Sequence, residues 1–410
     1  MPIRLLLLTQ WFDPEPTCKG LLFARELAKR GFEVEVVTGF PNYPGGRVYP
    51  GYRIKWIQRE EIDGVRITRL PLYPSHDRSS VGRILNYFSF ALAATIYGLF
   101  GAARPSVIYA YHPPLTVGLA AALIRIFRRV PLVLDVQDVW PDTLRATGMI
   151  RSQGLLSAVG WVCQFVYRAA DRIVVLSPGF RGLIIDRGVP GSKIEVISNW
   201  ADADALFQTP PPSAPHDFPK RNGDAFIVLF AGNLGIAQGL EAVIEAAALL
   251  QSSGECVEFV FLGAGLRLCA LKALAKSRGL DNVHFLPPVA MSEVGPYLQA
   301  ADALLVHLRK DKLFEITVPS KTQAYLAAGR PIIMGVAGDA ARMILRAGGG
   351  VVAESGDPDS IASAVLQLMS MGVQRRNALA QAGRAYFLRE LAVDVGVGRF
   401  AAIFSKLTNR

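Results

Sequence analysis

The chain has 410 residues, of which 51% are hydrophobic and 19% are charged. This length and composition predict two or more packed domains and exclude a disordered chain. The four cysteines show no C-x-x-C or Cys/His spacing, so the sequence indicates neither a zinc site nor a disulfide framework. A reducing cytosol is the compartment that this cysteine usage fits best.

The formal net charge of +10 lies almost entirely in the first half. Residues 1–200 hold 24 Lys and Arg against 15 Asp and Glu, whereas residues 201–410 hold 20 against 19. A basic half suits nucleic acid or an anionic membrane surface. The apolar segments of the same half favour the membrane surface, and we expect no nucleic acid partner.

Three apolar segments in the first half bear on membrane contact. Residues 84–103 form an uncharged run of 20, long enough to span a bilayer, but its polar residues Asn86, Ser89 and Thr95 favour a helix packed on a sheet. Residues 115–130 end in the basic RIFRR, and residues 155–167 carry Trp161 and Phe165. Together these segments predict a face that rests on lipid, with three ordinary core helices as the alternative.

Strand-like runs alternate with helix-length segments almost from end to end, which predicts α/β architecture with parallel sheets. The first run, IRLLLLT, is too short for a signal peptide and is expected to be a buried strand. The strands expected in the first half are 3–9, 34–38, 65–70, 107–111, 132–136, 172–176 and 193–198. A stretch rich in Pro and polar residues, 208–224, is expected to be a linker.

After this linker the alternation resumes. Strands are expected over 225–231, 257–262, 283–286, 303–307, 331–334 and 350–353, with helices over 241–250, 267–277 and 384–407. We therefore expect two Rossmann-like domains, 1–200 and 201–390, with a C-terminal helix of about 390–410 packing back on the first. Two such domains leave a cleft at the carboxyl ends of their strands, where ligands bind.

The stretch LFEITVPSKTQAYLAAGRPII, residues 313–333, reads as loop, short helix and strand. Pro319 and Ser320 open the helix, Ser320 and Gln323 form an S-x-x-Q capping box, and Gly329 closes it. The free N–H groups and positive dipole of such a helix start suit a phosphate, and Lys321 adds a full charge. The alternative is that the box only stabilises the helix and Lys321 is solvated.

Several further stretches follow one another in a specific order along the chain: VIYAYHPPLTVG, LDVQDVWPDTL, ADRIVVLSPGF, FAGNLGIAQGLEAVIEAA and FLGAG, followed by the stretch described above. In this order of motifs, nearly the whole chain resembles the GT-B glycosyltransferases of family 4, and within it the WbuB-type enzymes of O-antigen and exopolysaccharide synthesis. This resemblance implies transfer of a sugar from a nucleotide donor with retention of the anomeric centre, typically without a metal.

In the first half the catalytic candidates are His112 and Asp138. His112 lies just past VIYAY, where the resemblance implies contact with the donor sugar and where a neutral imidazole can orient a hydroxyl. Asp138, within the DVQDVWPD cluster, is expected near the acceptor, with another of its acids capping a helix. Lys19 and Gly20 are expected to bind substrate, because a glycine after the first strand lets the backbone approach a ligand.

The resemblance also implies an E-x7-E pair, in which the first acid approaches the donor sugar and the second holds the ribose. Glu315 meets the first position and Gln323 the second; aligned from Gly329 instead, the pair falls on Ile316 and Ala324. Gln323 therefore either bonds the ribose or serves only in capping.

A second departure concerns the Arg and Lys that grip the diphosphate in many family members. These positions read Asn233 and Gln238 here, so the charge is expected from Lys321 and Arg309, which a helix N-terminus supplements. The remaining substrate-binding candidates are Asn233, Gly263, Phe285, Leu286 and Ser320, with the base expected against the backbone near 285–287.

Two motifs resemble cofactor-binding motifs, but their position or spacing does not match what such sites require. Asp202 and Asp204 have D-x-D spacing but stand where the family has an interdomain stretch, so no metal is expected. Gly232, Gly235 and Gly239 lack the spacing of a dinucleotide fingerprint, so no nicotinamide cofactor is expected.

We therefore expect a metal-independent, retaining hexosyltransferase in the cytoplasm, peripheral or monotopic on the inner face of the cell membrane. Its donor would be a UDP-linked sugar, such as N-acetyl-L-fucosamine or a related amino or deoxy sugar. Its acceptor would be a polyprenyl-diphosphate-linked saccharide. The alternatives are a nucleotide-sugar 2-epimerase and a catalytically silent assembly protein.

Overall fold

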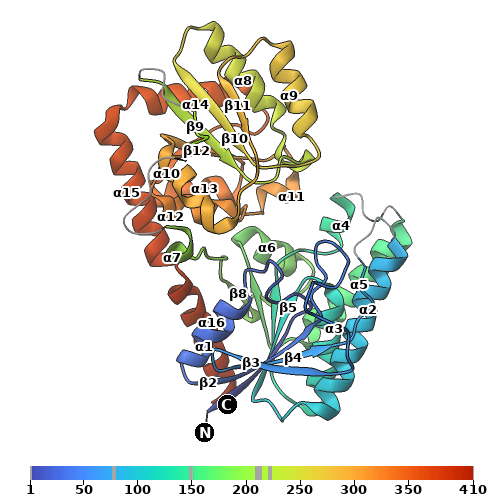
Figure 1. Cartoon of the computed structure of the whole chain (residues 1–410). Coiled ribbons are helices and arrows are strands. Elements are labelled where there is room, and N and C mark those ends of the chain that lie inside the picture. The colour runs from blue at the N-terminus through green and yellow to red at the C-terminus, as the bar shows by residue number, and fades with distance from the viewer. Residues whose placement is uncertain are drawn as a thin grey trace. The chain divides into compact units, whose positions relative to one another are not determined.

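The computed structural model describes residues 2–75, 80–146, 150, 152–207, 215–219 and 224–409. The chain forms two compact α/β units, each built on a largely parallel sheet as predicted (Figure 1). Unit 1 comprises Met1–Ser198 and Gly396–Arg410, and unit 2 comprises Asn199–Val395. The linker expected over 208–224 lies mostly outside the described residues.

The sheet of unit 1 has eight strands in the order β3-β4-β2-β1-β5-β6-β7-β8. Their bounds are β1 Ile3–Leu8, β2 Phe32–Gly39, β3 Gln58–Ile62, β4 Val65–Leu70, β5 Val107–His112, β6 Leu132–Val136, β7 Arg172–Val175 and β8 Ile194–Val196. All neighbours pair in parallel except β3, which pairs antiparallel with β4. The carboxyl ends of seven strands therefore lie at one edge of this sheet.

Helices cover both faces of this sheet. They are α1 Leu21–Lys29, α2 Ser80–Ile96, a π-helix η1 Tyr97–Gly101, α3 Leu115–Arg128, α4 Asp142–Ala146, α5 Gln153–Ala169, α6 Pro178–Asp186, a 3₁₀ turn η2 Gly191–Lys193 and the C-terminal α16 Val393–Thr408. In α16, the rings of Phe400 and Phe404 lie 5.6 and 5.9 Å from that of Tyr109 on β5. These contacts pack the C-terminal helix on unit 1.

Unit 2 has six parallel strands in the order β11-β10-β9-β12-β13-β14. They are β9 Phe226–Ala231, β10 Val257–Leu262, β11 Val283–Leu286, β12 Ala303–His307, β13 Ile332–Gly335 and β14 Gly350–Val352. Successive side chains of β9 enter two separate cores: Val228 lies in one and Leu229 in the other.

The helices of unit 2 lie on both faces of its sheet. They are α7 Ala203–Leu206, η3 Ile236–Gln238, α8 Glu241–Ser252, α9 Leu268–Ser277, η4 Met291–Glu293, α10 Val294–Ala300, α11 Lys312–Glu315, α12 Lys321–Ala328, α13 Asp339–Ala347, α14 Pro358–Ser370 and α15 Gly372–Glu390. The single tail helix expected over 384–407 is wrong. It is broken after α15 because Leu391 is buried in the unit 2 core and Ala392 forms a β-bridge with Ala201.

The apolar run 84–103 forms α2 and η1, and its two sides differ. Phe90, Ala94 and Tyr97 are buried against the unit, as expected for a helix on a sheet. The other side exposes a stripe of apolar residues: Val81, Ile84, Leu85, Phe88, Leu92, Ile96 and Phe100. By length and composition, Val81–Gly101 is long and apolar enough to cross a bilayer.

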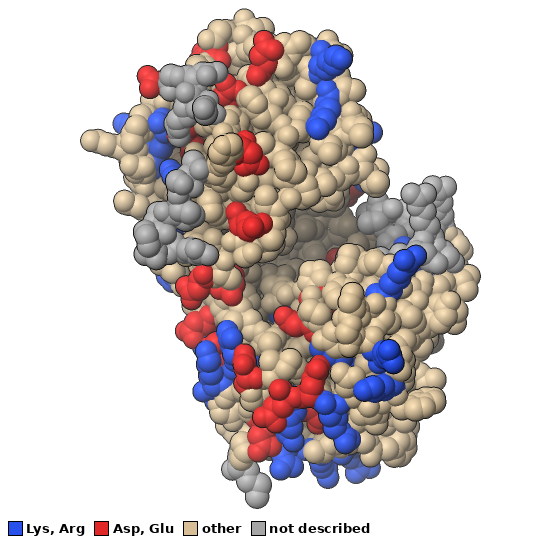
Figure 2. Space-filling model, viewed as in Figure 1, with Lys and Arg blue, Asp and Glu red and all other residues tan. Residues whose placement is uncertain are grey.

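The other two apolar segments differ from each other. α3 packs against β5, α2 and α5 and is largely buried, so the lipid-facing role expected for residues 115–130 is wrong over most of that helix. In α5, by contrast, Leu155, Trp161 and Phe165 are exposed. On the face drawn in Figure 2, unit 1 carries several groups of Lys and Arg, some interleaved with acidic side chains.

Candidate active site

The carboxyl edge of the unit 2 sheet gathers most of the second-half candidates, because the strands are parallel. The ends of β9 and β10 approach so closely that a Cβ at Gly263 would overlap the Gly232 carbonyl, and both glycines have positive φ, 133° at Gly232 and 142° at Gly263. Only glycine fits here without strain. A Cβ at Gly232 would lie 3.2 Å from the Nζ of Lys321, so the lysine lies over this backbone.

Lys321, the first residue of α12, carries the most perturbed cation of this edge. Its Nζ lies 3.4 Å from the centroid of the Phe230 ring, is enclosed, and has no hydrogen-bond partner among the described residues. Burial lowers the pKa of Lys321 to about 7. A buried amine without a counter-ion is costly to charge, so the geometry suits an incoming anion.

Arg309 follows β12 and reaches the turn that carries Gln238. Its backbone N–H donates to the Ala237 carbonyl at 2.9 Å, and its exposed guanidinium lies 3.8 Å from Asp311. The Gln238 side chain accepts the Gly235 N–H at 3.1 Å, while Asn233 is exposed after β9. Arg309 therefore supplies a cation beside the position where Gln238 lacks one.

Glu315 ends the short helix α11 with an exposed carboxylate that makes no ion pair to a described residue. Its backbone is packed against Gly338, where a Cβ would overlap the Glu315 carbonyl. Gly338 follows β13 at a φ of 76° and precedes α13. This contact holds Glu315 at the carboxyl edge of the sheet.

The capping box predicted for α12 is wrong. Among the described residues, the Ser320 side chain makes no capping hydrogen bond to the start of the helix. The Gln323 amide, oriented so that its nitrogen faces two carbonyls, donates to Ser320 O at 2.8 Å and Pro319 O at 3.2 Å. Gln323 is 1% exposed and its amide nitrogen is engaged by these two carbonyls, so a ribose contact stays a prediction. The closure of the helix at Gly329, with a φ of 63°, is confirmed.

The segment expected to receive the base ends β11. The Phe285 ring stacks on Phe261 with a centroid distance of 5.2 Å, and the Leu286 carbonyl accepts the Gly263 N–H at 3.1 Å. Both residues thus adjoin Gly263 at this edge. Contact with a base stays a prediction.

In unit 1, His112 and Asp138 lie at the carboxyl ends of the adjacent strands β5 and β6, where His112 pairs in register with Val136. The His112 side chain is fully buried, neither ring nitrogen has a hydrogen-bond partner among the described residues, and its ring meets that of Trp140 edge-on at 5.7 Å. Burial lowers the pKa of His112 to about 4, so the imidazole is neutral near pH 7. Burial raises the pKa of Asp138.

Lys19 does not lie where a substrate contact was predicted. Its Nζ is 2.7 Å from Asp135 Oδ2, and both side chains have no exposed surface. Asp135 also accepts hydrogen bonds from Tyr109, at 2.6 Å, and Gln137, at 2.7 Å. Lys19 therefore forms a buried structural ion pair with Asp135, which contradicts the predicted role of Lys19 in binding substrate.

Gly20 adjoins the side chain of Asp13 rather than an open site. The Leu21 N–H at the start of α1 donates to Asp13 Oδ2 at 2.6 Å, and a Cβ at Gly20 would overlap this oxygen. The absence of a side chain at Gly20 thus lets the Asp13 carboxylate reach the start of α1. We had predicted that a ligand would occupy this place.

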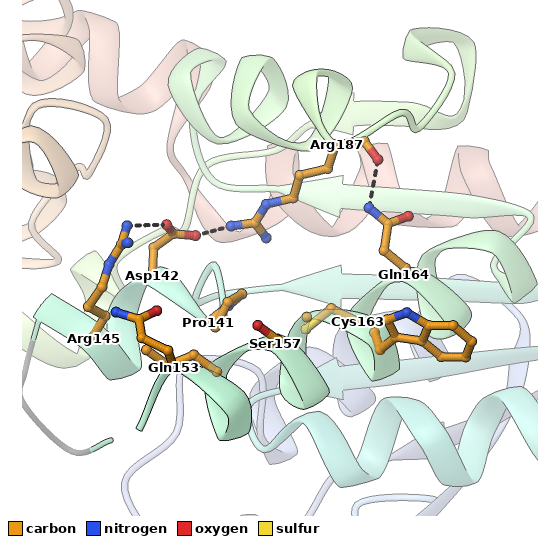
Figure 3. A pocket seen from close by; sticks show the side chains of 11 residues that line it. Pro141, Asp142, Arg145, Gln153, Ser157, Cys163, Gln164 and Arg187 are labelled. Carbon is orange, nitrogen blue, oxygen red and sulfur yellow. Dashed lines mark hydrogen bonds and ion pairs between the residues drawn. The ribbon is translucent and has the colours of Figure 1, made fainter. Parts of the chain in front are cut away.

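A hollow of about 430 Å³ lies between α4 and α5 (Figure 3). Asp142, in the first turn of α4, forms ion pairs there with Arg145 and Arg187; the helix cap expected from one of the acids of this cluster stays a prediction. Arg187 also donates to the Trp140 carbonyl at 2.7 Å. One wall of the hollow thereby positions Trp140, whose ring contacts His112.

The first acid of the D-x-D motif has a structural role. Asp202 accepts the Ala205 N–H at 3.1 Å and caps α7. A role in metal binding is not needed to account for it.

Comparison with known proteins matches both units to glycosyltransferase families. The Glycosyl transferase 4-like domain matches residues 21–200, and Glycosyl transferases group 1 matches residues 215–386. The chain is 29% identical over 320 residues to WcaI of Escherichia coli (strain K12), whose name assigns it to colanic acid biosynthesis, covering 74% of this chain and 75% of the relative. It is 28% identical to WbjE of Pseudomonas aeruginosa, named a probable glycosyltransferase, covering 68% and 71%.

Among solved structures, HepE of Anabaena in complex with UDP-glucose has a TM-score of 0.69 at 15% identity, covering 98% of this chain and 100% of that one. This likeness shows the fold, and together with the matches above it defines a glycosyltransferase of the GT-B class. Within that class the chain belongs to glycosyltransferase family 4 and is a hexosyltransferase.

Proposed function

We propose that this glycosyltransferase moves a sugar from a UDP-linked donor to a lipid-linked saccharide during synthesis of a cell-surface polysaccharide. The observation that carries the proposal is the enclosed Lys321 amine at the carboxyl edge of β9, which has no hydrogen-bond partner in the part of the chain that the structure describes. The glycosyltransferase relatives WcaI and WbjE, and the UDP-glucose complex of HepE, support the class of reaction and of donor.

The donor diphosphate would bind at the start of α12. Lys321 would supply one cation at the start of α12, and Arg309 a second one at the end of β12. The N-terminal N–H groups of α12 would add dipolar attraction. These groups would replace the cations that Asn233 and Gln238 lack. The base would lie beyond Gly263, toward Phe285 and Leu286.

The reaction would retain the anomeric configuration by front-face attack. The bond between the anomeric carbon and the diphosphate oxygen breaks, the acceptor oxygen bonds the same face, and the departing phosphate oxygen takes the acceptor proton. Lys321 and Arg309 would stabilise the charge on the diphosphate, which is the main catalytic demand. No metal ion is required when these cations meet that demand.

Three further side chains would act on the sugars. Glu315 has a free carboxylate at the same edge as Lys321 and would approach the donor sugar. His112 is neutral, and its ring nitrogens have no hydrogen-bond partner within the described ranges; it would orient a hydroxyl by hydrogen bonding, and Asp138 would hold the acceptor. Removing water around these groups protects the donor from hydrolysis.

The acceptor would be a polyprenyl-diphosphate-linked saccharide held by unit 1. The basic excess of residues 1–200 and the exposed apolar stripe of α2 support peripheral association with the cytoplasmic face of an anionic membrane. The transferred sugar would be N-acetyl-L-fucosamine or a related amino or deoxy sugar.

The donor site is tested by thermal shift of the purified chain against UDP, GDP, ADP and dTDP, with and without EDTA. We expect UDP to raise Tm regardless of EDTA, because a ligand that binds only the folded state stabilises it. Lys321→Met should abolish this rise, whereas Lys312→Met, which removes an exposed lysine of α11, should preserve it. A Tm unmoved by all four nucleotides would contradict the proposal.

A further inference from the structure

The segment of residues 47–57, between β2 and β3, presents an unusual surface. Trp56 is 88% exposed, and Ile54 and Ile57 are exposed beside it. Tryptophan is rarely left in water to this extent, and a cluster of three large apolar side chains on one short loop marks an interaction site.

The same segment is basic. It contains Arg47, Arg53 and Lys55 and no acidic residue, and none of these three cations forms an ion pair with a described residue. Free cations that alternate with tryptophan and isoleucine match an anionic lipid surface, where the rings enter the headgroup layer and the charges meet the phosphates. This charge complementarity identifies lipid as the occupant.

The base of the segment is fixed to the sheet. Arg69 is fully buried, donates to the Asp13 carbonyl at 2.7 Å, pairs with Glu60 at 2.5 Å and lies 4.9 Å from the ring centroid of Tyr52. The contact between Arg69 and Tyr52 thus fixes the segment to the sheet, and its exposed face needs no folding transition to bind lipid.

The topology places the segment at the carboxyl edge of the unit 1 sheet. β3 is antiparallel to β4 and Gln58 pairs with Arg69, so the chain enters β3 at the edge where β4 ends. α2 starts after β4 from this same edge, and its first half exposes Ile84, Leu85 and Phe88. His112 lies at this edge as well, at the end of β5.

We propose that residues 53–57 insert into the interface of an anionic bilayer, together with the exposed residues of the first half of α2. The carboxyl edge of the unit 1 sheet then faces the lipid, and a lipid-linked acceptor reaches His112 and Asp138 from the membrane plane. This rests on the proposed lipid-linked acceptor and adds the surface that meets the membrane. It places that surface at residues 53–57 and not at Trp161 of α5.

The test is sedimentation of the full chain with sucrose-loaded phosphatidylcholine vesicles, with and without phosphatidylglycerol. Trp56→Ala should lower the partition coefficient about tenfold or more, because a tryptophan side chain buries a large apolar area. Arg53→Gln with Lys55→Gln should lower it about twenty-five-fold on phosphatidylglycerol vesicles only, since each cation contributes about fivefold. The matched control is Trp161→Ala, which removes a side chain 83% exposed and should leave the partition within about twofold of wild type.

Two results would overturn the inference: Trp56→Ala that binds vesicles like wild type, or loss of binding in Trp161→Ala alone. The thermal shift with UDP separates the proposals. Trp56→Ala should keep the full shift, because residue 56 lies outside unit 2. If UDP produced no thermal shift in the wild type, the proposed donor site would be contradicted, and the vesicle-binding result would be unaffected.

Discussion

Donor binding is predicted to draw a proton onto Lys321. The Nζ of Lys321 is enclosed over Phe230 and has no hydrogen-bond partner among the residues that the structure describes. Burial alone lowers its pKa from 10.5 to about 7. No charged neighbour contributes to this shift. Above pH 7 the empty site therefore holds a neutral amine, and a bound diphosphate favours the ammonium.

The size of the effect follows from linkage. If the bound amine stays charged to pH 9, the dissociation constant of UDP rises about tenfold per pH unit above pH 7. Between pH 7 and pH 9 the expected loss of affinity is about fiftyfold, or about 2 kcal/mol. The terminal phosphate of UDP has its second pKa near 6, so its own charge is nearly constant in this window.

Isothermal titration calorimetry in EDTA, at several pH values and in two buffers of different ionisation enthalpy, measures the dissociation constant of UDP and the number of protons taken up on binding. We expect uptake of nearly one proton at pH 8.5 and little at pH 6. Lys321→Met should bind UDP weakly, with no pH dependence above pH 7. A wild-type affinity that is constant from pH 7 to pH 9, with no proton uptake, would refute the reasoning.

The unliganded protein supplies an independent readout of the same residue. Between pH 7 and about 10.5 the unfolded chain binds more protons at Lys321 than the folded chain, so the free energy of unfolding rises with pH in that window. Relative to Lys321→Met, the gain between pH 7 and pH 9 is about 2 kcal/mol. Urea unfolding at pH 7 and pH 9 measures the difference, and equal slopes for both proteins would contradict it.

Other predictions concern single side chains of the two edges. Glu315→Gln should lower transfer at least about a hundredfold while leaving the dissociation constant of UDP within about threefold, and equal losses in both would contradict a role at the sugar. His112→Phe should fold normally and lose transfer, and because the pKa of His112 is about 4, wild-type activity should show no step from this group between pH 6 and pH 8. Lys19→Met should cost about 3–5 kcal/mol of stability by leaving Asp135 buried and unpaired, Lys19→Met with Asp135→Asn should recover much of it, and a Lys19→Met protein as stable as wild type would show that the pair is not structural.

The parallel strands were predictable because their apolar runs are buried on both faces. β4, β6, β10, β11 and β12 have the predicted bounds. The missed strand β3, QREEI, carries charges and is largely exposed at an edge, so it shows no apolar run. The break between α15 and α16 was not predictable from helix periodicity, because it depends on the tertiary bridge to Ala201.

The candidate site divides in the same way. The position of Lys321 at the start of a helix was predictable because Pro319 and Ser320 open that helix and Gly329 closes it, and this reasoning needs only local sequence; its contact with a diphosphate stays a prediction. Lys19 was misassigned because its partner Asp135 lies more than a hundred residues away and no local pattern shows the pair. Gly20 was misread for a similar reason, since the carboxylate of Asp13 reaches it through a loop whose path the sequence does not reveal.

The central claim is metal-independent transfer from a UDP-sugar that depends on Lys321. Its most direct test incubates the protein with radiolabelled UDP-linked sugars and membrane lipid extract in EDTA, then counts the label in the organic phase. The account predicts that wild type and Lys312→Met transfer label to lipid and that Lys321→Met transfers at least about a hundredfold less. Full transfer by Lys321→Met, or wild-type transfer that EDTA abolishes and a divalent cation restores, would contradict it.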